Sequence, residues 1–210
     1  MSSPLERAVE VMDRLRSPGG CPWDAAQTHE SLTRYLLEEA YEVIEAIETG
    51  DLALLREELG DLLLQVLFHA RITQELPPGQ AFGIEDVAND LVDKLVRRHP
   101  HVFAGADAGS AEQLNETWER LKVEEKGRTS AADGVPLNQP ALALAAKLVA
   151  RARRAALRVD PPAGADIGAR LMALVAEAVD ADVDPEAALR AAAREYRAAM
   201  VDAESAEPEK

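Results

Sequence analysis

Apolar residues recur at three- and four-residue spacing along most of this 210-residue chain, and this spacing constrains the fold more than any other feature. The segment with Leu36, Leu37, Ala40, Val43 and Ile44 is typical, because these positions lie on one face of a helix. Residues with β-branched side chains rarely alternate with polar ones, and aromatic residues make up only 4% of the chain. We therefore expect an all-α fold.

Glycine and proline divide the pattern into separate helices. The breaks predict helices over residues 5–15, 28–48 (or 31–48), 52–75, 84–98, 111–126, 140–158, 167–179 and 185–201. Asp51 follows Gly50 and is placed to cap the third of these helices. The short connection at Gly50 predicts that the second and third helices are antiparallel neighbours.

The charge balance limits the classes of partner. The net charge of −15 and the pI near 4.7 argue against nucleic acid, because binding phosphates needs a basic surface. A single cysteine, Cys21, excludes an intramolecular disulfide. No apolar stretch approaches the ~20 residues of a membrane span. We expect a cytoplasmic protein with neither nucleic acid nor membrane as partner.

Residues 28–61 are strongly acidic, with ten acidic and two basic side chains. A solvated helix face usually places opposite charges four residues apart, whereas Glu38 and Glu42 place like charges there. Glu58 and Asp61 lie in a strongly apolar helix, where a buried carboxylate needs a compensating charge. These acids are therefore candidates for a binding site.

The acids form two pairs on neighbouring helices. Glu39 and Glu42 lie three residues apart, as do Glu58 and Asp61, so each pair occupies one helix face. Four facing carboxylates suit a hard divalent cation, Mg²⁺ or Mn²⁺. A di-iron site would need Glu-x-x-His on two helices, and no histidine of this chain follows a glutamate by three.

Basic and aromatic residues further along the chain complete the pattern. Lys94, Arg97 and Arg98 gather at a helix end, where cations also favour the helix dipole. Trp118 and Lys122 lie one turn apart on the following helix. Carboxylates for a metal, cations for phosphates and an aromatic ring for a base together predict a nucleotide polyphosphate site.

Several of these segments resemble one known family. Glu38-Glu39-Ala40-Tyr41-Glu42, followed by Glu58-Leu59-Gly60-Asp61, is similar to the EExxE…ExxD motif of the MazG nucleoside triphosphate pyrophosphohydrolases. The loop Gly20–Asp24 with Gln27 and Thr28, and the segment Lys94–Phe103, also match the MazG pattern. The resemblance covers about residues 5–126.

The resemblance implies an all-α helical bundle of the MazG type, whose four-helix core is completed by dimerisation. It also implies Mg²⁺-dependent hydrolysis of a nucleoside triphosphate to the monophosphate and pyrophosphate, with Mn²⁺ as a possible substitute and house-cleaning of the nucleotide pool as the role. Its site residues, carried over by position, are metal ligands Glu39, Glu42, Glu58 and Asp61, catalytic Glu38, phosphate-binding Lys94, Arg97 and Arg98, and Trp118 with Lys122 near the nucleotide. The alternative is a homologue that binds nucleotide or supports a dimer without turnover.

Composition changes after Gly127, since 26 of the 39 alanines lie in residues 131–210. We predict a catalytic domain over residues 1–130 and, over 131–210, a degenerate second MazG-like copy with a disordered tail from Glu204 to Lys210. Shifting the chain by 108 positions aligns Glu58 with Asp166 and Asp61 with Ala169. We therefore expect the second half to serve packing or assembly.

Overall fold

A computed structural model describes residues 2–105, 109–125, 127 and 129–206. The chain forms two compact units, Met1–Ala111 and Glu112–Lys210. Every regular element of the described residues is a helix, which confirms the predicted all-α fold. The predicted boundary near residue 130 lies inside the second unit, and the assignment of catalysis to residues 1–130 stays a prediction.

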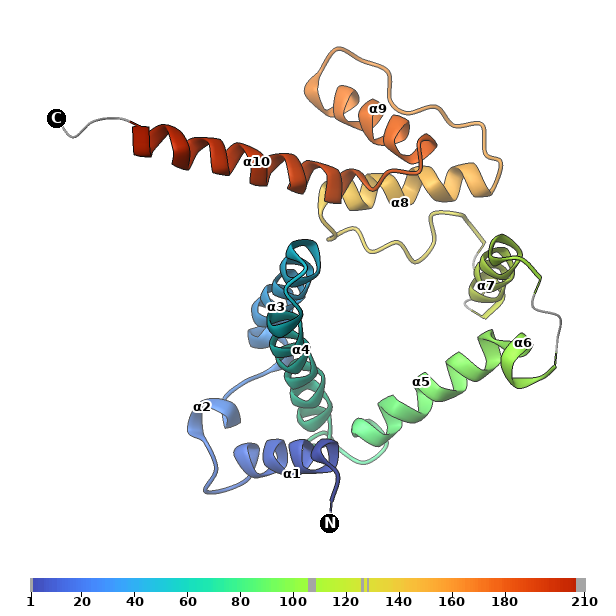
Figure 1. Ribbon diagram of the computed structural model, residues 1–210. Helices are drawn as coiled ribbons and strands as arrows, with labels where there is room; N and C mark the ends of the chain where they lie inside the picture. Colours follow the sequence, from blue (N-terminus) through green and yellow to red (C-terminus); the bar gives the residue numbers. More distant parts are fainter. Residues whose placement is uncertain (1, 106–108, 126, 128, 207–210) are drawn as a thin grey trace. The chain divides into compact units, whose positions relative to one another are not determined.

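The first unit holds six helices of the described chain (Figure 1). They are α1 (Pro4–Arg16), α2 (Pro22–Ala25), α3 (His29–Thr49), α4 (Leu52–Thr73), α5 (Ile84–Arg98) and α6 (Pro100–Phe103). The short helices α2 and α6 were not predicted from the sequence. Both begin with a proline, whose fixed φ suits the first position of a helix even though it ends the preceding one.

The antiparallel hairpin of α3 and α4 is the centre of this unit. Gly50 ends α3 in the left-handed conformation, with φ of 73°, and so reverses the chain within one residue. Asp51 then caps α4 by accepting hydrogen bonds from the backbone N–H groups of Ala53 and Leu54, as predicted. Because the turn is so short, residues equally far from Gly50 in the two helices lie opposite each other.

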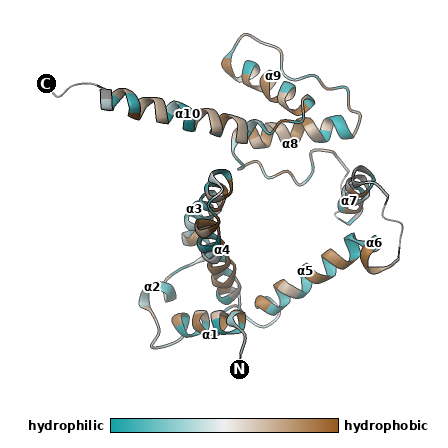
Figure 2. Cartoon of the chain, viewed as in Figure 1, coloured by the Kyte–Doolittle hydropathy of each residue, from teal (hydrophilic) through white to brown (hydrophobic). Residues whose placement is uncertain are grey.

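The hydrophobic core lies at the end of the hairpin that is remote from Gly50. It joins α1, α3 and α4 through Met12, Leu32, Leu67, Phe68 and Ile72. Apolar residues continue along α4 beyond these core residues (Figure 2).

Arg16 fastens the N-terminal segment to this core. Its guanidinium is buried, donates two hydrogen bonds of 3.0 and 2.9 Å to the Glu75 carboxylate, and donates to the backbone oxygens of Asp24 and Gln27. It also lies over the ring of Phe68, 5.6 Å from the ring centroid. A single side chain therefore connects α1, the α2 loop and the end of α4.

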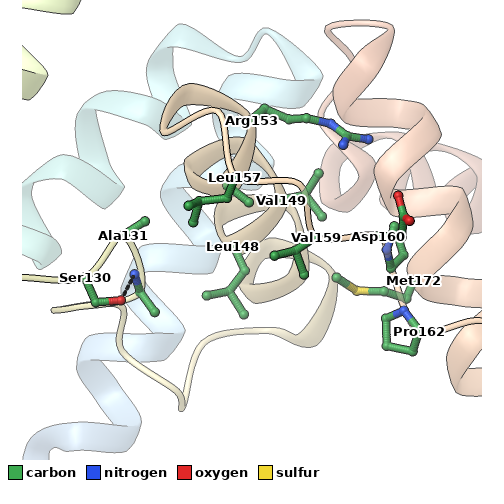
Figure 3. Close-up of a pocket in the computed structure, with 13 residues that line it drawn as sticks. Ser130, Ala131, Leu148, Val149, Arg153, Leu157, Val159, Asp160, Pro162 and Met172 are labelled. Carbon is green, nitrogen blue, oxygen red and sulfur yellow. Dashed lines mark hydrogen bonds between the residues drawn. The ribbon is translucent and has the colours of Figure 1, made fainter.

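The second unit contains α7 (Ala111–Glu125), α8 (Ala141–Arg154), α9 (Ile167–Asp180) and α10 (Pro185–Ala206). Helices α8 and α9 pack together, and Arg153 pairs with Asp180 through two 3.0 Å hydrogen bonds. Beside Arg153 an apolar cavity of about 270 Å³ opens between α8, Met172 of α9 and the 157–162 segment (Figure 3).

Two helix ends in the second unit differ from the prediction. Helix α8 ends at Arg154 rather than near residue 158, because Ala156 adopts a positive φ of 50° that no helix continues. Helix α10 continues to Ala206 rather than ending near residue 201, so residues 204–206 of the predicted disordered tail are helical. Alanine and glutamate are strong helix formers, which explains the extension. Residues 207–210 lie outside the described residues.

Candidate metal centre and substrate site

Three carboxylates meet between α3 and α4. One oxygen each from Glu39, Glu58 and Asp61 lies within 4.8 Å of the others. The hairpin register explains this contact, since Glu39 precedes Gly50 by as many residues as Asp61 follows it. Glu58 joins them from the turn before Asp61 on the same face of α4.

Glu42 belongs to the same cluster. It lies one turn after Glu39 on α3, and its charge contributes to the raised pKa values of both Glu39 and Glu58. The structure thus brings Glu39, Glu58 and Asp61 together, with Glu42 beside them. We call Glu39, Glu42, Glu58 and Asp61 the carboxylate cluster.

Burial and mutual repulsion define the electrostatics of the cluster. Burial, followed by the charges of Asp61 and Glu42, raises the pKa of Glu39 above its ordinary value. Burial, followed by Glu42 and Asp61, likewise raises the pKa of Glu58, which is only 9% exposed. No basic side chain is among the causes of either shift.

The donor set fits a hard divalent cation. All the side chains that converge are carboxylates, and the raised pKa values show that a neighbouring positive charge would relieve an unfavourable interaction. Zinc and copper prefer nitrogen or sulfur ligands, which the cluster does not contain. The described group contains no histidine or cysteine, so the chemistry is that of oxygen ligation.

Glu38 lies on α3 beside Glu39 and is exposed. Glu38 points about 100° away from Glu39, but it lies one turn before Glu42 and therefore neighbours Glu42 on the surface of α3. The acidic group described between α3 and α4 does not include it.

The three predicted phosphate-binding residues lie in the last turns of α5. Lys94 and Arg97 are exposed and Arg98 is half-buried. Helix α5 packs against the core through Ile84 in its first turn, so the cations lie at the opposite end of the helix from that contact. The turn into α6 is fixed by His99, whose Nδ1–H donates a 2.6 Å hydrogen bond to the Leu95 carbonyl.

Trp118 and Lys122 lie on α7 and belong to the second unit. The Lys122 ammonium lies over the Trp118 ring, with Nζ 4.0 Å from the ring centroid. The two residues therefore form a cation–π pair with each other, an arrangement that presents a charge and an aromatic surface together.

Two features near the hairpin were not predicted as a site. Trp23 packs edge-on against Tyr35 and Phe68, with centroids 5.9 and 6.4 Å apart, yet remains 51% exposed. Trp23 is therefore packed on one side and open to solvent on the other.

The second missed feature is a histidine pair. The Nδ1 atoms of His29 and His69 are 2.7 Å apart, and the rings stack with centroids 5.0 Å apart. Within the described chain, His69 Nε2 is buried without a hydrogen-bond partner. The hairpin register could have revealed the pair, because the two histidines lie almost equally far from Gly50 on opposite helices.

No helix of the described residues is both long and apolar enough to cross a membrane. Fold and site together define an all-α protein with a carboxylate cluster suited to a divalent cation.

Comparison with known proteins gives the family. Residues 27–103 match the model of the MazG nucleotide pyrophosphohydrolase domain. The chain is 40% identical over 216 residues to the nucleoside triphosphate pyrophosphohydrolase/pyrophosphatase MazG of Thermotoga maritima, covering 91% of this chain and 82% of that protein. This chain belongs to the MazG family, and the prediction of an enzyme of the nucleoside triphosphate pyrophosphohydrolase class is confirmed.

Two further relatives cover nearly the whole chain. An uncharacterized 26.1 kDa protein in the blaB 3′ region of Streptomyces cacaoi is 54% identical over 198 residues, covering 93% of this chain and 81% of that protein. The nucleoside triphosphate pyrophosphohydrolase of Mycolicibacterium smegmatis is 47% identical over 206 residues. That alignment covers 96% of this chain but only 60% of the mycobacterial protein.

Proposed function

We propose that this protein hydrolyses nucleoside triphosphates to nucleoside monophosphates and pyrophosphate in the presence of Mg²⁺. The observation that carries the proposal is the carboxylate cluster, in which acids from two helices converge. Burial and the neighbouring carboxylates raise the pKa values of Glu39 and Glu58, so a bound cation would be favourable there. The names of the Thermotoga and Mycolicibacterium relatives support the same reaction.

In this proposal Glu39, Glu42, Glu58 and Asp61 hold Mg²⁺, and Mn²⁺ can substitute because it accepts the same oxygen ligands. When bound, such a cation would neutralise charge on the phosphate oxygens and would make water a better nucleophile. Glu38 accepts a proton as the oxygen of water bonds to phosphorus. The phosphoanhydride bond breaks, and pyrophosphate and the monophosphate separate.

The remaining roles concern the substrate. Lys94, Arg97 and Arg98 bind the phosphates, because fixed cations stabilise the charge that develops during phosphoryl transfer. Trp118 and Lys122 lie near the nucleotide, and their cation–π pair offers a surface for the base.

We propose a homodimer as the active form. Large apolar residues on the α3–α4 hairpin are exposed in the single chain, including Leu37, Tyr41, Ile47 and Leu59. An exposed apolar surface of this extent is typical of an interface. Pairing two hairpins would build a four-helix core. In such a dimer, the cations of α5 from one chain would lie near the carboxylate cluster of the other chain.

We place this activity in the cytoplasm, where it would remove unwanted nucleoside triphosphates from the nucleotide pool. The partner in this role is the nucleotide alone, with neither nucleic acid nor membrane.

The test is pyrophosphate release from a panel of canonical and oxidised ribo- and deoxyribonucleoside triphosphates, with and without Mg²⁺. We expect Mg²⁺-dependent release from at least one substrate, restored by Mn²⁺ after chelation. If no member of the panel gave metal-dependent release while nucleotide still bound, the chain would be a non-catalytic nucleotide-binding homologue.

A further inference from the structure

Gln65 is a buried amide that lies between the carboxylate cluster and the histidine pair. It follows Asp61 by one turn of α4 and precedes His69 by one turn, and only 4% of it is exposed. At about 100° per residue, these three residues and Glu58 fall within about 80° of one another around the helix. One face of α4 therefore carries the acids, the amide and the imidazole in that order.

The amide of Gln65 and the imidazole of His69 each contain an unpaired atom. Among the residues that the structure describes, Oε1 of Gln65 and Nε2 of His69 are the buried side-chain atoms that have no hydrogen-bond partner. An unpaired buried polar atom is unfavourable, whereas an apolar side chain of the same size would avoid that penalty. The two atoms belong to adjacent turns of one face, so a single partner between them can satisfy both.

The state of the His69 ring makes the two atoms complementary. Its Nδ1 is 2.7 Å from Nδ1 of His29, so one of these nitrogens donates and the other accepts. Burial lowers the pKa of His69, so at pH 7.5 the ring is neutral and has a proton on only one nitrogen. When His29 donates, the proton of His69 is on Nε2, which is then a donor for an acceptor such as Oε1 of Gln65.

A water molecule suits the space between these two atoms. The atoms are too far apart for a direct hydrogen bond, since neither has a partner. Water can accept a hydrogen bond from an imidazole N–H and donate one to an amide oxygen, and buried waters commonly satisfy buried polar groups in this way.

The nitrogen of the same amide suits the carboxylate cluster. Side chains of a helix lean toward its N-terminus, so Gln65 extends over the turn that carries Asp61. An ionised carboxylate only accepts hydrogen bonds, and an amide nitrogen only donates them. An amide can therefore connect an acid to an imidazole without adding charge to the cluster.

We propose that Gln65 is a positioning residue for the carboxylate cluster. Its amide nitrogen donates to Asp61 when the cluster holds its cation, and its Oε1 is joined through one buried water to Nε2 of His69. His29, His69 and Gln65 then form a hydrogen-bonded line that keeps an oxygen of Asp61 directed at the cation. The inference rests on the proposed function only for the presence of a cation at the cluster.

Cation binding in the absence of nucleotide tests the role of Gln65. Gln65→Met keeps the length of the side chain and removes the amide, and Gln65→Leu is a second variant in case the first does not fold. Gln80→Met is the matched control, because Gln80 is exposed and lies outside α4.

Isothermal titration should show Mg²⁺ affinity about tenfold or more weaker in Gln65→Met, the scale for losing a residue that orients a metal ligand. Gln80→Met should bind Mg²⁺ like the native chain. Equal affinities in the native chain and in a folded Gln65 variant would overturn the inference.

The EPR spectrum of bound Mn²⁺ separates positioning from a general effect on the fold. The spectrum depends on the symmetry of the ligands, so at saturating Mn²⁺ it should change in Gln65→Met and remain native in Gln80→Met. An unchanged spectrum in Gln65→Met would mean that Gln65 does not orient the ligands.

A double-mutant cycle tests the link through the water. His69→Leu should weaken Mg²⁺ binding in the native chain but cause no further loss in Gln65→Met, because the line is already broken there. Additive losses, or native affinity in His69→Leu alone, would overturn the link. In ¹⁵N NMR spectra of the native chain, His69 should carry its proton on Nε2, and a proton on Nδ1 would contradict the link.

These outcomes are distinct from those that test the proposed activity. A chain whose Mg²⁺ affinity depends on the Gln65 amide, but which hydrolyses no nucleoside triphosphate, would refute the activity and support the positioning role. Hydrolysis together with a Mg²⁺ affinity that is the same with and without the amide would do the reverse. A native chain that binds neither Mg²⁺ nor Mn²⁺ would overturn both.

Discussion

At the residue level, charge is the property that distinguishes the carboxylate cluster from the rest of the helical hairpin. One carboxylate oxygen each from Glu39, Glu58 and Asp61 lies within 4.8 Å of the other two. Burial and mutual repulsion raise the pKa values of the two glutamates. Such an arrangement costs stability when it is empty. Its acids should therefore be dispensable for folding and indispensable for function.

Glu42→Gln tests this expectation, because it removes one charge from the cluster. Turnover should fall by about 100-fold or more, the scale for losing one electrostatic group of an active site. The melting temperature should stay the same or rise, because repulsion decreases. Glu45→Gln, an exposed acid on the same helix, is the control and should change neither quantity. A sharp fall in melting temperature for Glu42→Gln would mean that the acid is structural.

The histidine pair predicts a dependence of stability on pH. Burial, followed by the neighbouring His29, lowers the pKa of His69 below its ordinary value. The folded state therefore binds a proton less readily than the unfolded state, so stability is fully present above the ordinary pKa near 6.5 and is lost as pH falls below it. Urea unfolding between pH 8 and pH 5 should show this loss, and His69→Gln should reduce it.

The carboxylate cluster changes stability in the opposite direction. A raised pKa of Glu39 or Glu58 means that protonation favours the folded state as pH falls. The comparison between the native chain and His69→Gln separates the two contributions, because both proteins contain the same acids. Identical pH profiles for the two proteins would contradict the role given to His69.

At the level of elements, the long helices could be predicted from the sequence, whereas the short helices and the contacts between distant segments could not. The spacing of apolar residues located α3 and α4, and Gly50 with Asp51 located the turn between them. That turn also determined which acids face each other. The same register places His29 opposite His69. The Arg16–Glu75 contact joins residues 59 positions apart on helices that no short turn connects, and local patterns do not encode such a pair.

Helix α9 offers a test of the second unit. The Asp166 side chain, which aligned with Glu58, accepts a hydrogen bond from the backbone N–H of Ala169 and so caps α9. Asp166→Ala should lower stability by about 0.5–2 kcal/mol, the usual effect of losing an N-cap. It should leave nucleotide hydrolysis unchanged. Asp166→Asn retains a capping oxygen and should recover the stability measured by urea unfolding. Loss of activity in both variants would place Asp166 in the active site.

At the level of the whole molecule, the two compact units separate the proposed site residues. The carboxylate cluster and the α5 cations belong to the first unit, whereas Trp118 and Lys122 belong to the second. Sequence reasoning placed all of them in one domain because it followed the order of motifs along the chain. Compactness depends on which helices contact each other in space, and the spacing of residues within one helix does not contain that information.

Two truncated chains test this division of roles. A chain ending at Gly127 keeps Trp118 and Lys122 and, if it stays soluble and dimeric by sedimentation, should retain Mg²⁺-dependent hydrolysis. A chain ending at Ala111 lacks both residues and should bind nucleotide more weakly while keeping its affinity for Mg²⁺. Isothermal titration with each ligand measures both quantities. An inactive soluble dimer ending at Gly127 would assign a catalytic role to the second half.

Arg16 links the opening of the segment before α3 to the opening of the core. A four-residue helix between two loops normally opens readily, so its backbone amides exchange with solvent faster than those of a core helix. Here the loop oxygens of Asp24 and Gln27 are held by a guanidinium that is itself bound to the end of α4. The loop can open only when that guanidinium leaves the core. The amides from residue 22 to 27 should therefore exchange together with those at the end of α4, so that Trp23 keeps its place beside Tyr35 for as long as the core is intact.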